Sequence, residues 1–192
     1  MHGPTGRPGA PVIDRALLSH LDRQGVSHCL IGGLALAAWG VARYTADADL
    51  LTMDPRILEP SLWLEWPGEA PRITRGEADD PLGGVVRFPG PPRQDLILGR
   101  GAAPRIALSS SEKSEGFPCP VASPLGLILL KLEAGSPQDA ADILALLGNA
   151  EALGRLAMRM EVEAQTPSLT SEARAFWQRI TGLWLSSEAA RS

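Results

Sequence analysis

The stretch Ile-Gly-Gly-Leu-Ala-Leu-Ala-Ala-Trp-Gly-Val-Ala-Arg-Tyr-Thr-Ala-Asp-Ala-Asp-Leu, residues 31–50, carries the most informative pattern of the chain. Its double glycine, Gly32-Gly33, follows an apolar segment and precedes a run of helix-forming residues. A strand that passes through two glycines into a helix leaves backbone N–H groups free at the helix N-terminus, where they attract anions such as phosphate. The pattern therefore predicts a strand–turn–helix unit with an anion site at the turn, and a tight turn without a ligand is the alternative.

Two aspartates alternate with apolar residues at the end of the same stretch. Residues two apart in a strand point to the same face, so Asp47 and Asp49 are expected side by side, with Leu50 facing the other way. At about 6 Å and an effective dielectric of about 20, two carboxylates repel by roughly 3 kcal/mol, which a proton or a shared cation relieves. Oxygen ligands beside a phosphate-binding turn favour Mg²⁺ (or Mn²⁺) over zinc. We expect a divalent-metal site here, and a solvated acidic turn is the alternative.

Together these residues resemble a known family. The double glycine, the gap of thirteen residues after Gly33 and the pair Asp47-x-Asp49, preceded by Arg43-x-Thr45, are similar to the minimal nucleotidyltransferases of the DNA polymerase beta-like superfamily, in its abortive-infection and toxin–antitoxin branch. The resemblance covers roughly residues 26–147, and 50–92 match poorly. It implies an α/β (α+β) fold, with a nucleotidyltransferase-like mixed sheet flanked by helices and a helical C-terminal part. It also implies transfer of a nucleoside monophosphate from a nucleoside triphosphate to a hydroxyl.

The resemblance assigns roles to single residues. Asp47, Asp49 and Asp95 are implied as catalytic carboxylates and metal ligands, with Asp95 on a neighbouring strand, where it deprotonates or positions the attacking hydroxyl. As alternatives, Asp95 is a solvated strand residue, Lys131 covers apolar surface with its stem, and Asp139 is a helix cap. Only Lys113 and Lys131 among the 18 basic residues are lysines, which favours a phosphate-binding role for Lys131. The implied nucleotide-binding residues are Gly32, Gly33, Arg43, Thr45, Lys131 and Asp139.

The expected cofactor is Mg²⁺ (or Mn²⁺), and the expected substrate is a nucleoside triphosphate. The implied acceptor is a tRNA 3′ end or a hydroxyl of a cognate partner protein, within a toxin–antitoxin system. Two alternatives stay open. One is a non-catalytic toxin–antitoxin partner protein of the same fold, and the other is a small-molecule-binding α/β domain whose glycines bind phosphate without a metal.

Composition limits the class of protein. A chain of 192 residues is expected to form one domain that buries about 70% of its unfolded surface. The net charge of −4 argues against binding to long DNA. Cys29 and Cys119 lack metal-ligand spacing, which favours a reducing, cytoplasmic setting. The longest stretch free of both charge and strong polarity, residues 29–42, is too short to span a membrane as a helix.

Periodicity and turn residues predict the elements. Residues 1–10 are expected to be a disordered lead-in, 11–122 the nucleotidyltransferase-like core, and 123–192 a helical part packed on it within a single domain. The expected strands are 27–31, 47–53, 85–88 and 95–98. The expected helices are 13–24, ended by Gly25, then 34–38, 123–134 and 136–147, ended by Gly135 and Gly148, and finally 151–163 and 171–185. Residues 55–63 have some helical character, and prolines and glycines break 67–104 into short pieces.

Overall fold

The computed structural model describes residues 13–43, 45, 47–77, 82–150 and 152–189 of the chain. The predicted lead-in at residues 1–10 and the predicted helix start at residue 151 lie outside these residues. No helix in these ranges is both long and apolar enough to cross a membrane.

A mixed sheet with the strand order β1-β2-β5-β4-β3 forms the centre of the fold. The central strands β2 and β5 are parallel, and all other neighbours are antiparallel. The predicted strands are confirmed, although β1 is shorter than expected, and β3 was not predicted. The five strands are β1 (Cys29–Ile31), β2 (Ala48–Thr52), β3 (Arg72–Arg75), β4 (Leu82–Phe88) and β5 (Gln94–Gly99).

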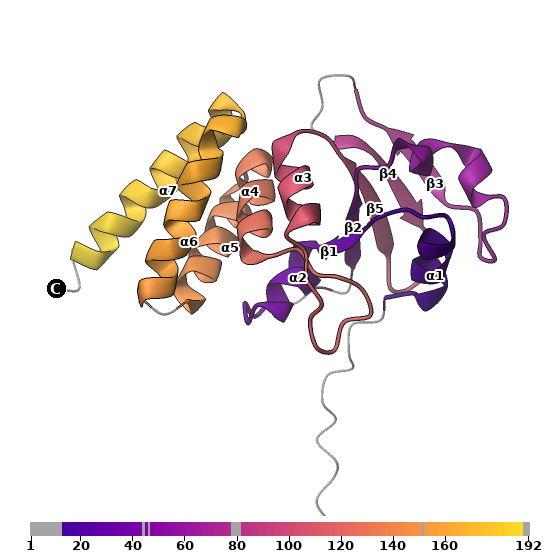
Figure 1. The fold of residues 1–192 in the computed structure, drawn as a ribbon, viewed down its shortest axis with the longest axis horizontal. Coiled ribbons are helices and arrows are strands. Elements are labelled where there is room, and N and C mark those ends of the chain that lie inside the picture. Colours follow the sequence, from indigo (N-terminus) through magenta and orange to yellow (C-terminus); the bar gives the residue numbers. More distant parts are fainter. Residues whose placement is uncertain (1–12, 44, 46, 78–81, 151, 190–192) are drawn as a thin grey trace, which may run out of the picture.

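Different elements cover the two faces of the sheet. A Cβ atom added at Gly99 would lie 2.5 Å from Pro104, so α3 packs on the face that Gly99 shares with Asp95. A Cβ atom at Gly84, which pairs with Leu98 and so belongs to the other face, would lie 2.8 Å from Leu58 in the 3₁₀ turn η1 (Pro55–Leu58). Figure 1 shows α4–α7 gathered on one side of the molecule, with α2 and α3 between them and the sheet. The helices are α1 (Arg15–Arg23), α2 (Gly32–Ala38), α3 (Ala102–Ser109), α4 (Pro124–Ala134), α5 (Pro137–Asn149), α6 (Ala152–Gln165) and α7 (Ser171–Ala189).

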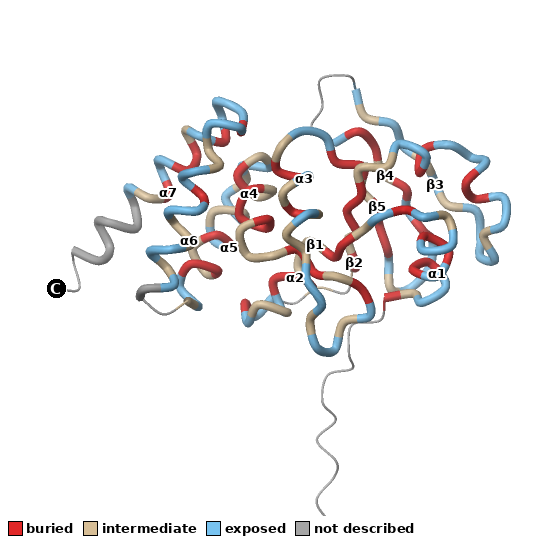
Figure 2. The backbone as a smooth tube through the Cα atoms, in the orientation of Figure 1, coloured by how far each residue is buried: buried red, intermediate tan, exposed pale blue. Residues whose placement is uncertain are grey.

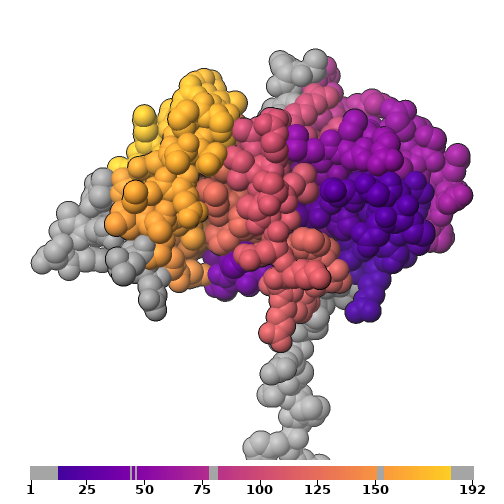
Figure 3. Space-filling model, viewed as in Figure 1, coloured from indigo at the N-terminus to yellow at the C-terminus, as the bar shows by residue number. Residues whose placement is uncertain are grey.

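The buried residues run from the sheet into the first C-terminal helices. Figure 2 shows burial concentrated in the central strands and α4, while the outer sides of α6 and α7 are exposed. Leu50, Leu96 and Ile128 are fully buried, which places α4 within the same hydrophobic core as β2 and β5. In the space-filling view, the last helices and the β3–β4 region lie at opposite ends of the molecule (Figure 3). Apolar packing therefore anchors α4, which carries the predicted site residue Lys131, to the sheet.

Local chemistry explains the predicted helix ends, with one correction. The Ser123 and Ser136 side chains accept N-terminal backbone hydrogen bonds, each with proline in the first turn. Gly135 ends α4 in the left-handed region at φ +70°. The predicted end of α5 at Gly148 is wrong, because this glycine does not adopt a positive φ and the helix continues to Asn149.

Two other segments differ from the sequence-based expectation. Residues 55–63 form two 3₁₀ turns, η1 and η2 (Pro60–Trp63), since Pro60 has no N–H to continue a single helix. The predicted irregular region contains β3 and α3. In α3, Pro104 lies in the first turn, where a helix tolerates proline. Proline at this position therefore accompanies a helix start rather than a break.

Candidate functional site

The turn between β1 and α2 packs directly against an acidic side chain. Gly32 has φ +69°, and a Cβ atom at this position would lie 2.2 Å from Oδ2 of Asp49. A Cβ atom at Gly33 would lie 2.7 Å from Cγ2 of Thr45. Both glycines are therefore needed for space, and Gly32 also for its backbone conformation. The backbone of the turn therefore lies against Asp49, a candidate metal ligand. The predicted anion site at this turn stays a prediction.

The three predicted carboxylates come from the two central strands. Asp47 immediately precedes β2, Asp49 lies within it, and Asp95 lies in β5 directly opposite Asp49 in the parallel register. The placement of Asp95 on the neighbouring strand is confirmed. Residues paired across a sheet point to the same face, so the side chains of Asp49 and Asp95 share the face that α3 covers further along β5.

Asp49 lies in an environment that disfavours its charge. Burial raises the pKa of its carboxyl, and the negative charges of Asp95 and Asp47 raise it further. Arg93 and Arg43 lower the pKa of Asp49 without cancelling these effects. A divalent cation between Asp47 and Asp49 would relieve the repulsion and favour the ionised form of Asp49.

Asp95 is held by two arginines that sequence reasoning did not identify. Nε and Nη2 of Arg87 donate to its two oxygens, each at 3.0 Å, and Nη2 of Arg93 donates to Oδ2 at 2.9 Å. Burial alone would raise the pKa of Asp95, which is 7% exposed, but the hydrogen bonds from Arg87 and Arg93 outweigh burial and hold it below its usual range. Asp95 is therefore ionised at neutral pH. The available signal was Arg87, a charged residue inside an apolar strand.

A second cluster joins Arg43 to the C-terminal helices. Nζ of Lys131 on α4 donates to Oδ1 of Asp139 at 3.0 Å and to Oδ2 of Asp142 at 2.6 Å. Arg43 forms an ion pair with the same Asp142, and Gln138 donates to its Oδ1 at 3.0 Å. Asp142 is 4% exposed, so its carboxylate is buried among these partners. Lys131 and Arg43 are thus fixed beside the site by a shared buried carboxylate.

Asp139 confirms the helix-capping alternative and adds a contact. Its side chain forms a capping box with Ser136 at the start of α5, in addition to its bond with Lys131. Burial opposes ionisation, but hydrogen bonds from Ser136 and Lys131 lower the pKa of Asp139 below its usual range. Thr45 bonds locally to the backbone of Asp47, with its Oγ1 3.3 Å from the Asp47 amide nitrogen. Both side chains help to fix the shape of the site.

One cavity unites nearly all the predicted site residues. It has a volume of about 380 Å³ and is lined by Gly32, Gly33, Arg43, Thr45, Asp47, Asp49, Lys131, Ser136, Gln138 and Asp139. Asp95 is the one predicted residue that does not line it, because its carboxylate is turned toward Arg87 and Arg93. The lining thus combines the carboxylates of Asp47, Asp49 and Asp139 with the cationic side chains of Arg43 and Lys131.

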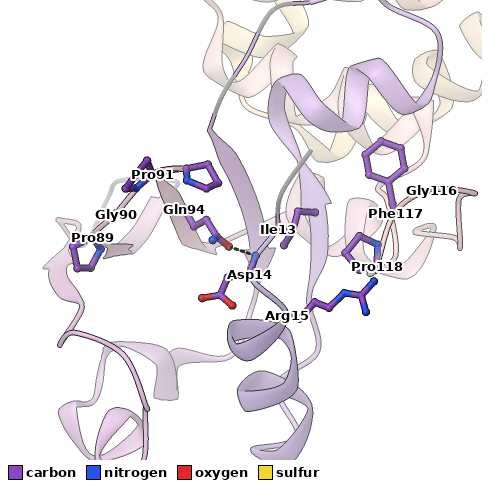
Figure 4. A pocket seen from close by; sticks show the side chains of 11 residues that line it. Ile13, Asp14, Arg15, Pro89, Gly90, Pro91, Gln94, Gly116, Phe117 and Pro118 are labelled. Atoms are coloured by element: carbon purple, nitrogen blue, oxygen red, sulfur yellow. Dashed lines mark hydrogen bonds between the residues drawn. The ribbon is translucent and has the colours of Figure 1, made fainter. Parts of the chain in front are cut away.

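A larger cavity lies at a different place. It measures about 740 Å³ and opens between the start of α1, the β4–β5 connection and residues 116–118 (Figure 4). In it, Oε1 of Gln94 accepts a hydrogen bond from the Asp14 amide at 3.1 Å. Gln94 and Asp95 are neighbours in β5 and point to opposite faces of the sheet. This cavity is therefore separate from the three carboxylates of the candidate site.

The donor set fits Mg²⁺ or Mn²⁺ as a shared ion. Within the described ranges, no group of three or more His, Cys, Asp or Glu side chains is arranged around one point. Asp47 and Asp49 supply two oxygen ligands, and Mg²⁺ in nucleotide sites typically uses one or two carboxylates, with substrate phosphates and water as the remaining ligands. The observation that speaks for a cation at this point is that two half-buried carboxylates, Asp47 and Asp49, line the same cavity.

Comparison with known proteins shows a similarity of fold. No family model and no curated protein matches the chain. The solved structure of ANT(2″)-Ia in complex with adenylyl-2″-tobramycin is similar over 78% of this chain and 94% of its own, with a TM-score of 0.51 and 15% identity. The lincomycin-bound lincosamide antibiotic adenylyltransferase LnuA aligns over 73% of this chain and 99% of its own, with a TM-score of 0.47 and 16% identity. The mixed sheet flanked by helices that the sequence predicts is confirmed, and the chain shares the fold of the ANT(2″)-Ia structure over the matched residues.

Proposed function

We propose that the protein is a metal-dependent nucleotidyltransferase. In the proposed reaction, an acceptor hydroxyl attacks the α-phosphorus of a nucleoside triphosphate, the new P–O bond forms, the α–β bond breaks, and pyrophosphate leaves. The observation that carries this proposal is the pair Asp47 and Asp49, with Asp49 half-buried, raised in pKa and in contact with the backbone of Gly32. A negative site of this kind beside a glycine turn is suited to a divalent ion with a triphosphate.

The residues around Asp47 and Asp49 would bind different parts of the metal–triphosphate complex. Bound Mg²⁺ or Mn²⁺ supplies charge neutralisation for the triphosphate. Lys131 and Arg43 line the same cavity and would contact the β- and γ-phosphates, while Asp142 keeps both cations in place. The two glycines leave room for the phosphates beside the backbone.

Asp95 suits one of its two predicted roles better. A general base works best when its pKa lies near the operating pH, and the two arginines hold the pKa of Asp95 low. Its fixed, ionised carboxylate is better suited to position the attacking hydroxyl, or to complete the metal site, than to remove a proton. The hydroxyl proton would then pass to solvent.

The wider setting is also part of the proposal. We place residues 11–122 as the catalytic core and 123–192 as a helical part that supplies Lys131 and Asp139, with the protein acting in the cytoplasm, in line with its two free buried cysteines. The resemblance supports a toxin–antitoxin role with a tRNA 3′ end or a partner protein as acceptor. The non-catalytic partner protein is the competing candidate.

Transfer of label tests the proposal. The protein is incubated with each of the four α-labelled triphosphates, Mg²⁺ or Mn²⁺, and in separate reactions total RNA, candidate partner protein, tobramycin or lincomycin. Label is expected in one macromolecular acceptor with the wild type and in none with Asp47→Asn. Absence of label from every reaction, together with an unchanged melting temperature on addition of metal and triphosphate, would support the non-catalytic candidate.

A further inference from the structure

A line of charged residues crosses four strands of the sheet. Arg72 on β3 pairs with Arg87 on β4, Arg87 pairs with Asp95 on β5, and Asp95 pairs with Asp49 on β2. Residues paired in register point to the same face, so this row leads from the proposed metal site across the sheet to two arginines. Arg93, two residues before Asp95 along the chain, joins the row through its hydrogen bond to that carboxylate.

The pairing of Arg72 with Arg87 in this row does not stabilise the sheet. Like charges directly opposite each other on antiparallel strands are destabilising, yet Arg72 stands opposite Arg87. Arg72 is exposed and forms no ion pair with any residue in the described part of the chain. Arg87 and Arg93 remain 46% and 50% exposed in their side chains, and their bonds to Asp95 leave further guanidinium N–H groups available.

The three arginines surround a single hollow. A cavity of about 320 Å³ is lined by Arg72, Arg87 and Arg93, and Glu69 is its one acidic residue among those described. It adjoins Asp95 through the two arginines that hold this carboxylate, on the other side of Asp95 from Asp49. The cavity proposed for the triphosphate is lined by Asp47, Asp49 and Lys131, so an acceptor bound in this second hollow would reach Asp95 from the opposite side.

We propose that Arg72, Arg87 and Arg93 bind phosphate groups of the acceptor, and that the acceptor is the 3′ end of a nucleic-acid strand. The proposal rests on the proposed function and adds the acceptor class to it. Guanidinium groups pair with phosphate in a bidentate geometry, and three of them around one hollow match the last few phosphates of a strand. A polycationic acceptor such as tobramycin would be repelled by the same surface. The net charge of −4 limits the contact to this local patch.

Arg72 allows a test that leaves the proposed catalytic groups untouched. Binding of a short fluorescein-labelled single-stranded RNA with a free 3′ hydroxyl is measured by anisotropy for the full-length wild type, Arg72→Gln and Arg75→Gln. Arg75 is the matched control, because it lies on the same strand, is exposed, and faces the other side of the sheet, where it binds the Leu58 carbonyl and Glu59. Arg72→Gln is expected to weaken RNA binding roughly 5- to 20-fold and to lower the salt dependence by about one phosphate contact, with Arg75→Gln unchanged.

The response to metal and triphosphate separates this proposal from the proposed function. The melting shift with Mn²⁺ and ATP is expected to be the same in all three proteins. Three outcomes would overturn the acceptor proposal. They are a wild type that does not bind RNA, an equal loss of RNA binding in both variants, and saturable tobramycin binding that Arg72→Gln does not strengthen. Each of these outcomes leaves the metal and triphosphate site intact. A wild type whose melting temperature does not rise with Mn²⁺ and ATP would instead count against the proposed function.

Discussion

Asp49 and Asp95 face each other across the parallel pair β2 and β5, and their pKa values are shifted in opposite directions. Burial and two neighbouring carboxylates act on Asp49, whereas two guanidinium groups neutralise Asp95. Among the described residues, the sheet thus places a carboxylate without an ion pair directly opposite one that has two. This asymmetry gives the two positions different pH dependence.

Asp49→Asn should raise the melting temperature of the metal-free protein at pH 7. Because the folded pKa of Asp49 lies above its unfolded value, its contribution to stability declines as pH rises from the unfolded pKa through the folded one. The amide does not titrate, so its advantage should shrink as pH falls toward about 4. Circular dichroism melts between pH 4 and pH 8 measure this difference. A variant that melts below the wild type at pH 7 contradicts the electrostatic account of Asp49.

Asp95→Asn is the paired experiment and should have the opposite sign. The folded pKa of Asp95 is lowered, so its stabilisation is present above the unfolded pKa and is lost as pH falls through the folded one. The variant should melt below the wild type at pH 7, and the gap should close at acidic pH. Equal melting of the two proteins at pH 7 would show that the arginine contacts contribute no stability.

Asp47→Asn and Asp49→Asn should each abolish stabilisation by Mn²⁺ with triphosphate. For the wild type at about 100 times the dissociation constant, linkage gives about 2.7 kcal/mol, which corresponds to a melting shift of roughly 5–10 °C for a chain of this size. Each variant keeps only one carboxylate of the pair, so its shift should fall close to zero. Differential scanning fluorimetry checks this result. A full shift in either variant would remove that residue from the metal site.

Gly32→Ala should both destabilise the fold and disturb the site. A methyl group would collide with Oδ2 of Asp49 and would also strain the backbone at φ +69°. Gly25→Ala is the control, because Gly25 has φ +65° and nothing within 4 Å of an added Cβ atom. The control should lose about 1 kcal/mol from backbone strain alone, and Gly32→Ala clearly more. Urea unfolding of both variants isolates the cost of the carboxylate collision, and equal losses would disprove it.

Lys131→Ala should weaken triphosphate binding about tenfold and also destabilise the metal-free protein. The lysine pairs with Asp139 and Asp142, and Asp142 would keep only Arg43 and Gln138 as partners. Removing one partner of a buried ion pair costs about 3–5 kcal/mol, and the remaining Arg43 should reduce this to about 2–3 kcal/mol. Urea unfolding and calorimetry with triphosphate measure the two effects separately. A double variant with Asp142→Asn should recover part of the stability without recovering binding.

Local patterns were sufficient to predict much of the fold. Alternation of aspartates with apolar residues located β2, and a short apolar run located β5. The serine and proline caps located α4 and α5. The strand β3 was missed because Arg-Ile-Thr-Arg at an exposed edge has too few apolar residues to give a signal. Its formation depends on pairing with β4, which a local pattern does not encode.

The site was predictable to the extent that its residues are close in sequence. Gly32, Asp47 and Asp49 lie within one stretch, and the spacing alone indicates that a turn and a strand carry them. The partners of Asp95 depend on the register between β4 and β5, which places Arg87 opposite it. Likewise, the burial of Asp142 depends on α4 and α5 packing together beside Arg43. These contacts follow from tertiary packing and leave no signature in residue spacing.

Asp139 uses its two oxygen atoms for different purposes. Oδ2 accepts the Ser136 amide at 3.1 Å and the Ser136 hydroxyl at 2.6 Å, while Oδ1 accepts from Lys131. A phosphate that draws Lys131 away from Oδ1 would therefore leave the cap of α5 in place. The lysine can change partners by a side-chain rotation, which does not require local unfolding of the helix end. Exchange of Lys131 between protein and phosphate thus does not require the opening of α5.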